Sequence, residues 1–265
     1  MSGPVLIDLT ADKLIGCEAL FPPEIENDRW VLYHGTSSVA EQQIDAEGLI
    51  WKPATYSKAD IDQLVSIFES MGWVGTNAAG MAVLKPFTQA GDFGSEDKKP
   101  VYFYDDGLAA APFYATRDCA GGETARAVRY AMADLDLFLE DEGVRNRRPV
   151  DLEWLRDSIA SLSDLRKRCF ATQDAYDYGI VYAVKFVPED LESLTYHNAM
   201  GIRCFRDLAA DRIVGKARLH AEDDVINRAD ERLDMFSRFM ERADDPNGLL
   251  CRLDGVRGSD PNNHR

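Results

Sequence analysis

Short runs of β-branched and aromatic residues occur near both ends of the chain, on either side of a helical middle. Each run is bounded by glycine or polar turn residues, a pattern typical of buried strands. Strands are therefore expected over residues 30–34, 101–104, 111–116, 178–187, 202–205 and 213–219. Strands on both flanks of a helical middle indicate an α+β fold.

Apolar residues spaced three or four apart predict helices elsewhere in the chain. A serine at position 37 or 38 can cap a first helix, which ends at Glu47-Gly48. Ser57 and Asp60 have the spacing of a capping box at the start of a second helix. Further helices are expected over 125–139, 152–165 and, with an amphipathic pattern, 225–240.

The chain is expected to form one large domain with an arm and a tail. Prolines at 22 and 23 interrupt regular structure, so residues 1–29 are interpreted as an N-terminal arm packed on the core. Residues 30–243 would form the domain, and the Asp-, Asn-, Gly- and Pro-rich segment 244–265 a mobile tail. Residues 73–100 contain four glycines and little periodicity, which suits either a lid over a site or a tolerated surface insertion.

Composition narrows the classes of partner. The 265 residues are 45% hydrophobic, enough for a real core, and carry a formal net charge of -16. This charge disfavours phosphate backbones and anionic membranes, so a protein partner is favoured over nucleic acid. The sequence has no run of eighteen apolar residues and no visible signal peptide, so we expect no membrane association and a cytoplasmic location, in the producing cell or in a target cell.

The cysteines and the common catalytic motifs exclude several chemistries. Five cysteines, widely spaced and odd in number, suit neither a zinc site nor a disulfide framework, so no metal is expected. The sequence also lacks Gly-x-x-x-x-Gly-Lys-Ser/Thr, His-Glu-x-x-His and Gly-x-Ser-x-Gly. Nucleoside triphosphatase, zinc protease and α/β-hydrolase functions therefore lack their recognisable parts.

Two short motifs carry the candidate chemistry. The first is Tyr33-His34-Gly35-Thr36, where a strand ends in a histidine before a small-residue turn. Its ring nitrogen and backbone amides can bond a ligand's ribose and amide groups, and Gly35 leaves room for close approach. The second is Phe113-Tyr114-Ala115-Thr116, whose tyrosine can stack on a planar ring held beside His34.

Together these motifs resemble the His…Tyr arrangement of diphtheria-toxin-like and poly-ADP-ribose-polymerase-like ADP-ribosyltransferases. The resemblance implies a split mixed β-sheet core with peripheral helices, which binds NAD⁺ between two half-sheets. His34 would bond a ribose of NAD⁺, the Gly35 backbone the nicotinamide carboxamide, and Tyr114 would stack on the nicotinamide ring. The neighbouring residues would complete the NAD⁺ contacts: Thr36, Ser37, Ala115 and Thr116. Residues 73–100 would lie where the family carries its donor loop.

The chain departs from this family at the third signature position. Its members usually carry a glutamate at the start of a late strand, where the carboxylate stabilises the positive charge that develops on the ribose. Ile202 is the nearest match here, which resembles the His-Tyr-Ile pattern of mono-ADP-ribosylating members, in which the acceptor supplies the carboxylate. The resemblance therefore implies an NAD⁺-dependent mono-ADP-ribosyltransferase acting on a macromolecular acceptor, as a toxin, effector or defence enzyme.

Other readings stay open. The missing carboxylate could come from Glu189, Asp190 or Glu192, which otherwise form an exposed acidic turn. The chain could bind NAD⁺ without catalysis, or bind a partner through residues 225–240. RNA 2′-phosphotransferases also carry His-Gly-Thr and lack the glutamate, and they need arginines for a phosphate, for which this chain offers Arg117, Arg126, Arg129 and Arg203. The net charge disfavours an RNA substrate.

Overall fold

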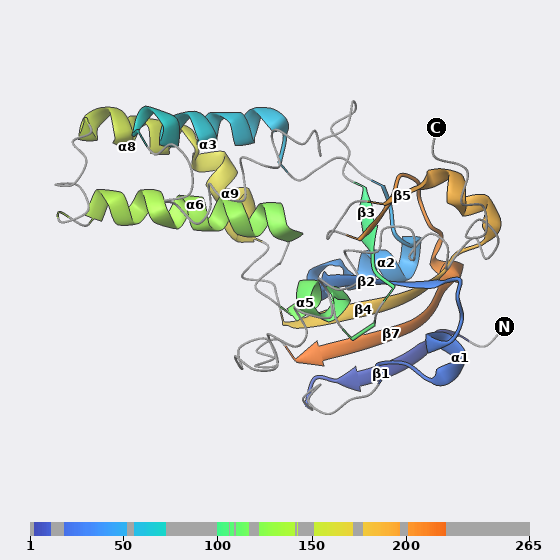
Figure 1. The fold of residues 1–265 in the computed structure, drawn as a ribbon. Helices are drawn as coiled ribbons and strands as arrows, with labels where there is room; N and C mark the ends of the chain where they lie inside the picture. The colour runs from blue at the N-terminus through green and yellow to red at the C-terminus, as the bar shows by residue number, and fades with distance from the viewer. Residues whose placement is uncertain are drawn as a thin grey trace. The chain divides into compact units, whose positions relative to one another are not determined.

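The computed structural model describes residues 3–11, 19–51, 56–72, 100–105, 107–108, 110–116, 122–140, 142, 151–171, 177–196 and 201–220. The chain divides into two compact units (Figure 1). We call them the sheet unit, made of Met1–Trp51, Pro100–Arg117 and Asp177–Arg265, and the helical unit, made of Lys52–Lys99 and Asp118–Tyr176.

The sheet unit contains a mixed four-stranded sheet and an antiparallel three-stranded sheet. The first has the order β1 (Val5–Leu9), β7 (Ile213–His220), β4 (Tyr178–Lys185) and β2 (Val31–Ser37). Strand β1 runs parallel to β7, and the other pairs are antiparallel. The second has the order β3 (Val101–Phe103), β6 (Ile202–Cys204) and β5 (Leu194–Tyr196). The expected α+β class is confirmed.

Short helices cover both faces of the four-stranded sheet. On one face lie α1 (Pro23–Glu26) and α5 (Ala110–Thr116), and on the other lies α2 (Glu41–Glu47). The unit also contains the short 3-10 helices η1 (Ser38–Ala40), η2 (Pro188–Ser193) and η4 (Ala210–Arg212). Alternate strand residues enter different apolar clusters, because successive side chains point to opposite faces. Tyr33 and Ala183 pack with α1 and α5 on one face. Leu32 and Val184 pack with α2 and the three-stranded sheet on the other.

Among the described residues of the helical unit, four helices pack around one apolar core. They are α3 (Lys58–Ser70), α6 (Gly122–Glu140), α8 (Leu152–Ser161) and α9 (Ser163–Ala171). The predicted capping box at α3 is confirmed, since the Ser57 hydroxyl accepts from the Asp60 backbone N–H and the Asp60 carboxylate accepts from that of Ser57. The single helix expected over 152–165 is wrong: the chain forms α8 and α9, and the apolar spacing continues across the break at Leu162.

One expected strand is also wrong, with a consequence for the site. Residues 111–116 belong to helix α5. Pro112 lies in its first turn, where backbone N–H groups have no partner within the helix, so the proline costs little there. Alanines at 110, 111 and 115 favour the helix further. Tyr114 is therefore carried by a helix that packs on the sheet and not by a neighbouring strand.

The strand expected to end at His34 is longer, because β2 continues through Ser37 and His34 lies within it with no turn directly after it. Neither Ser37 nor Ser38 caps the next helix through its side chain, and the N-cap of α2 is Ala40.

The remaining expectations are met or fall outside the described residues. Strands β3, β4, β6 and β7 lie where the sequence predicts them. The stretch interpreted as an N-terminal arm contributes β1, an edge strand of the sheet. Segments 73–99, 225–240 and 244–265 lie outside the described residues. Within the described ranges, no helix is long and apolar enough to cross a bilayer.

Candidate functional site

A backbone bridge joins the two sheets between β2 and the residue after β3. Tyr33 and Tyr104 exchange both backbone hydrogen bonds, with N···O distances of 2.7 and 2.8 Å. Among the described residues this bridge is not followed by one between Gly35 and Tyr102, the next pair in register. Alternate residues of a strand direct their backbone groups to the same edge, so Gly35 N–H and C=O face the β3 side, as those of Tyr33 do. We call this point the β2–β3 junction.

His34 is bonded to the opposite strand at this junction. Its Nδ1 lies 2.9 Å from the carbonyl oxygen of Tyr102. A carbonyl only accepts, so Nδ1 carries the hydrogen and Nε2 is left as an acceptor. Burial lowers the pKa of His34 and outweighs the opposing effect of this hydrogen bond. His34 is therefore neutral near pH 7, with a defined tautomer.

Helix α5 lies directly on the backbone of β2. A Cβ placed on Gly35 would lie 1.9 Å from the carbonyl oxygen of Ala111 and 3.1 Å from the backbone nitrogen of Ala115. Gly179, on the neighbouring β4, makes a similar approach, with a Cβ position 2.6 Å from the carbonyl oxygen of Ala115. Side chains at either glycine would therefore push the helix away. The sequence motif predicts the close approach at Gly35, but the structure shows that part of that space is occupied by α5.

Tyr114 projects from α5 toward the same junction. Its half-buried ring stacks on that of Tyr104, with centroids 5.3 Å apart and planes 12° apart. Tyr104 is the bridge partner of Tyr33. His34 and Tyr114 thus both contact β3 residues at the β2–β3 junction, His34 through Tyr102 and Tyr114 through Tyr104. They do so from opposite faces of the four-stranded sheet, because His34 lies beside Phe103 on the α2 face and Tyr114 belongs to the apolar cluster on the α5 face.

The other predicted NAD⁺ contacts differ in exposure. Thr36 is half-buried and Ser37 is buried, both at the end of β2. Ala115 and Thr116 are buried in α5, where the Thr116 hydroxyl donates to the carbonyl of Pro112 at 2.9 Å. Their contact with NAD⁺ stays a prediction.

Ile202 is fully buried in β6. It is the register partner of Phe103 in β3 and of Tyr196 in β5. Its side chain belongs to the apolar cluster that contains Phe103 and Cys204. This position therefore supplies packing and no polar group.

The interpretation of residues 189–192 as an exposed acidic turn is wrong for Asp190. Glu189 and Glu192 are exposed, but Asp190 is fully buried. Its carboxylate accepts from the Val187 backbone N–H at 2.8 Å and forms ion pairs with Arg206 and Arg212 at 3.1 and 3.4 Å. These arginines lie in later segments, which is why local sequence gives no sign of them. Asp190 is held as a structural anion and not as a mobile carboxylate.

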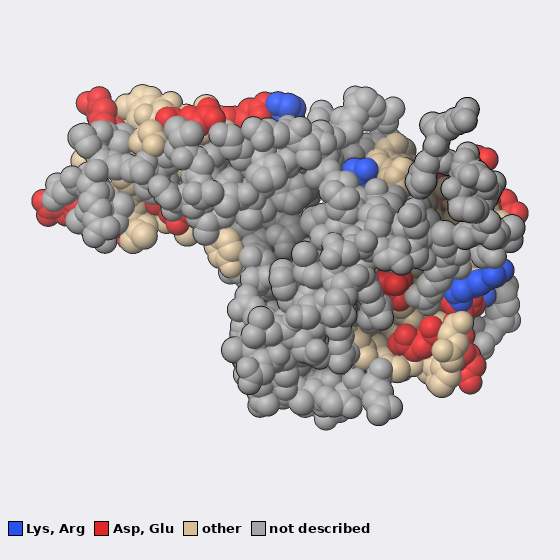
Figure 2. All heavy atoms as spheres, viewed as in Figure 1, with Lys and Arg blue, Asp and Glu red and all other residues tan. Residues whose placement is uncertain are grey.

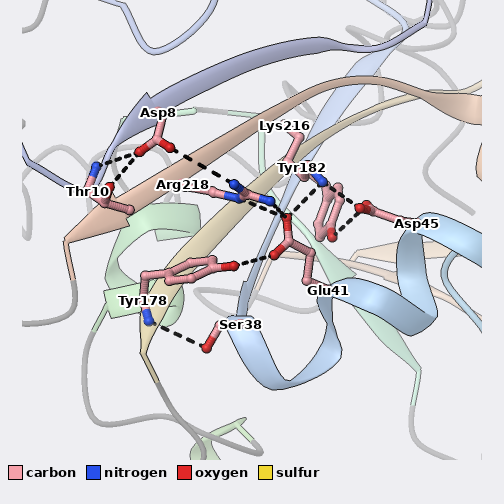
Figure 3. A network of polar contacts seen from close by, with 9 residues as sticks. All are labelled: Asp8, Thr10, Ser38, Glu41, Asp45, Tyr178, Tyr182, Lys216 and Arg218. Carbon is pink, nitrogen blue, oxygen red and sulfur yellow. Dashed lines mark hydrogen bonds and ion pairs between the residues drawn. The ribbon is translucent and has the colours of Figure 1, made fainter.

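Sequence reasoning also missed a buried polar network centred on Glu41 (Figure 3). Glu41 accepts from Arg218 Nη2 at 2.7 Å and from the Tyr178 hydroxyl at 2.5 Å, and it pairs with Lys216 at 2.8 Å. Burial alone would raise the pKa of Glu41, but hydrogen bonds from Lys216, Tyr178 and Arg218 outweigh it and lower the pKa. Two sequence patterns could have indicated this network: cations at alternate positions of β7, Lys216 and Arg218, and carboxylates four residues apart in α2, Glu41 and Asp45.

The arginines considered for a phosphate belong to different units of the chain. Arg203 lies on β6 with its guanidinium over the Phe205 ring, 5.6 Å from the centroid. Arg129 is buried in α6, in the helical unit. Arg117 and the side chain of Arg126 lie outside the described residues. Within those residues, no group of three His, Cys, Asp or Glu side chains has the arrangement of a metal site.

The chain was also compared with known proteins. Comparisons with protein-family models, with curated proteins and with solved structures found no match.

Proposed function

We propose that this chain is an NAD⁺-dependent mono-ADP-ribosyltransferase, which transfers ADP-ribose from NAD⁺ to a macromolecular acceptor. The observation that carries the proposal is the β2–β3 junction, where the ladder ends after one bridge. Gly35 offers a backbone donor and acceptor at this edge, the neutral His34 lies on the α2 face of β2, and the Tyr114 ring lies on the α5 face. This set of groups suits nicotinamide riboside.

Gly35 offers the first complementary contact. Its N–H and C=O face one edge, and a primary carboxamide carries one acceptor and two donors. The carboxamide of nicotinamide can therefore pair with Gly35 as a strand residue would. Tyr114 offers an aromatic face for the nicotinamide ring. His34 offers Nε2 as an acceptor for a ribose hydroxyl.

The transfer step requires a group that tolerates positive charge on the ribose. As the bond from the ribose C1″ to nicotinamide breaks, its electron pair leaves with nicotinamide, and C1″ becomes electron-poor. Fixed negative charge normally stabilises such a centre. Ile202 is apolar, and Asp190 is bound to two arginines. We propose that the acceptor supplies the charge: a carboxylate, or another nucleophile deprotonated in place, attacks C1″.

Charge bears on the class of acceptor. Asp and Glu are spread over the face drawn in Figure 2, and Lys and Arg are few among its described residues. With a net charge of -16, the chain repels polyanions such as RNA at long range. A carboxylate carried by a neutral or basic protein avoids this repulsion. A protein acceptor of that kind fits best.

Labelled NAD⁺ and a cell lysate test the proposal. His34→Ala and Tyr114→Ala should each reduce transfer of label at least about tenfold, the equivalent of one lost charge-free hydrogen bond or stacking contact. Controls are His220→Ala, an exposed histidine at the end of β7, and Tyr130→Ala, an exposed tyrosine of the helical unit.

The outcomes separate the competing functions. Equal labelling by all variants would contradict the site assignment. Label recovered as an ADP-ribose phosphate formed from RNA would indicate a 2′-phosphotransferase. Binding of NAD⁺ without release of nicotinamide would indicate a binding module.

A further inference from the structure

We infer that Glu41 is a positioning residue for the proposed NAD⁺ site. From the first turn of α2 it ties the end of β2 to β4 and β7, on the sheet face that carries His34. The inference rests on the proposed function, because it concerns the same site.

The register of the four-stranded sheet places this network beside the candidate site. His34 in β2 lies opposite Tyr182 in β4, and Tyr182 lies opposite Lys216 in β7. Residues directly opposite one another in a sheet share a face. In the next row, Thr36 lies opposite Ile180, which lies opposite Arg218. Lys216 and Arg218 therefore share the face of His34 and Thr36.

Helix α2 covers the cationic part of this face with two carboxylates, as Figure 3 shows. Glu41 and Asp45 are one helical turn apart, so both point to the sheet. Asp45 accepts from the Tyr182 hydroxyl at 3.1 Å and from Lys216 at 2.5 Å. Glu41 binds Lys216 and Arg218. The ring that lies opposite His34 is thereby held through its hydroxyl by the same network.

The chain between the site and Glu41 is short and is tied to β4. Ser37 ends β2, and Glu41 begins α2 four residues later. Between them, the Ser38 hydroxyl accepts from the backbone N–H of Asp177 at 2.9 Å. The Tyr178 hydroxyl then donates to Glu41 at 2.5 Å. The turn after β2 is therefore fixed at both ends, and Thr36 and Ser37 have little freedom to move.

Glu41 is suited to this role because its charge is buried. The residue is 8% exposed, and its carboxylate is compensated by two cations and one hydroxyl. Removal of the charge leaves Lys216 and Arg218 with less compensation in a half-buried setting, a change that strongly disfavours the packed arrangement. We expect α2 to loosen and the end of β2 to loosen with it.

The test compares Glu41→Gln and Tyr178→Phe with a matched control. The control is Asp60→Asn, which removes a carboxylate paired with Arg168 at 2.9 Å in the helical unit. Three quantities are measured: the Kd for NAD⁺, amide hydrogen exchange over residues 34–38, and the urea midpoint of unfolding. Glu41→Gln should raise the Kd about tenfold and Tyr178→Phe about threefold, with faster exchange over 34–38 in both. Asp60→Asn should lower the midpoint and leave the Kd and this exchange unchanged.

Each outcome supports or overturns the positioning role of Glu41. An unchanged Kd in folded Glu41→Gln, or a Kd that rises equally in Asp60→Asn, overturns the inference. If Glu41→Gln does not fold, Tyr178→Phe, which removes only one hydroxyl, decides in its place. If the wild type binds no NAD⁺, the proposed function fails, and hydrogen exchange alone decides whether Glu41 fixes residues 34–38.

Discussion

Replacement of Gly35 by alanine tests the approach of α5 to β2. The new Cβ would lie 1.9 Å from the Ala111 carbonyl oxygen, and an ordinary contact begins at 3.4 Å. The neighbouring atoms belong to backbone, so the helix must move by about 1.5 Å or the strand must bend. Overpacking of this kind costs about 1–3 kcal/mol. Alanine gains about 0.5–1 kcal/mol over glycine in a strand, which is too little to reverse the sign.

The expected result is a free energy of unfolding lowered by about 2 kcal/mol in urea titrations. Binding of NAD⁺ should weaken at least about tenfold, because α5 carries Tyr114 away from the junction. Gly3→Ala is the control, since its Cβ would meet nothing within 4 Å. If Gly35→Ala matches Gly3→Ala in stability and in NAD⁺ affinity, α5 does not rest on Gly35.

Three further predictions concern single residues. Burial lowers the pKa of His34 below 6.5 in the native state. The native state therefore binds fewer protons than the unfolded chain as the pH falls. The contribution of neutral His34 to the free energy of unfolding is complete above pH 6.5 and is lost as the pH falls through the native pKa. His34→Gln should flatten the fall of the urea midpoint between about pH 7 and pH 5, and an unchanged slope would show that the pKa of His34 is not lowered in the native state. Asp190→Asn should lower the free energy of unfolding by about 3 kcal/mol because two arginines lose a buried partner, whereas Glu189→Gln, at an exposed position, should match the wild type in the same titration. Ile202→Glu places a carboxylate at the proposed third site position but buries a charge beside Phe103, so it should cost about 3 kcal/mol or more. A folded Ile202→Glu protein with faster release of nicotinamide would show that this position faces the substrate.

Local sequence was sufficient to predict features that depend on interactions between neighbouring residues. The capping box of Ser57 and Asp60 depends on four consecutive residues, and it formed as expected. The segment 111–116 was predicted as a strand because aromatic residues favour strands. Its proline in the first turn and its alanines suit a helix equally, and a helix forms. Packing against glycines in β2 and β4 accommodates that helix, and these glycines are distant in sequence.

The burial of charged residues was not predicted from the sequence. The sequence around Asp190 predicts an exposed acidic turn, but in the fold Arg206 and Arg212 form ion pairs with this carboxylate. Glu41 was not singled out in the sequence, because the cations that compensate it, Lys216 and Arg218, lie far along the chain in β7. Burial of a carboxylate depends on compensation, and the compensating cations come from other segments.

The sequence by itself determined the α+β class, and its two motifs identified His34, Gly35 and Tyr114 as candidate site residues. Hydrophobic periodicity and turn residues act over a few positions, so they can be read without a fold. Only the tertiary structure decided that the ladder between β2 and β3 ends after one bridge, that Tyr102 sets the tautomer of His34, and that Tyr114 arrives on a helix. Each depends on the register between segments far apart in the chain, and register is a property of the packed sheet.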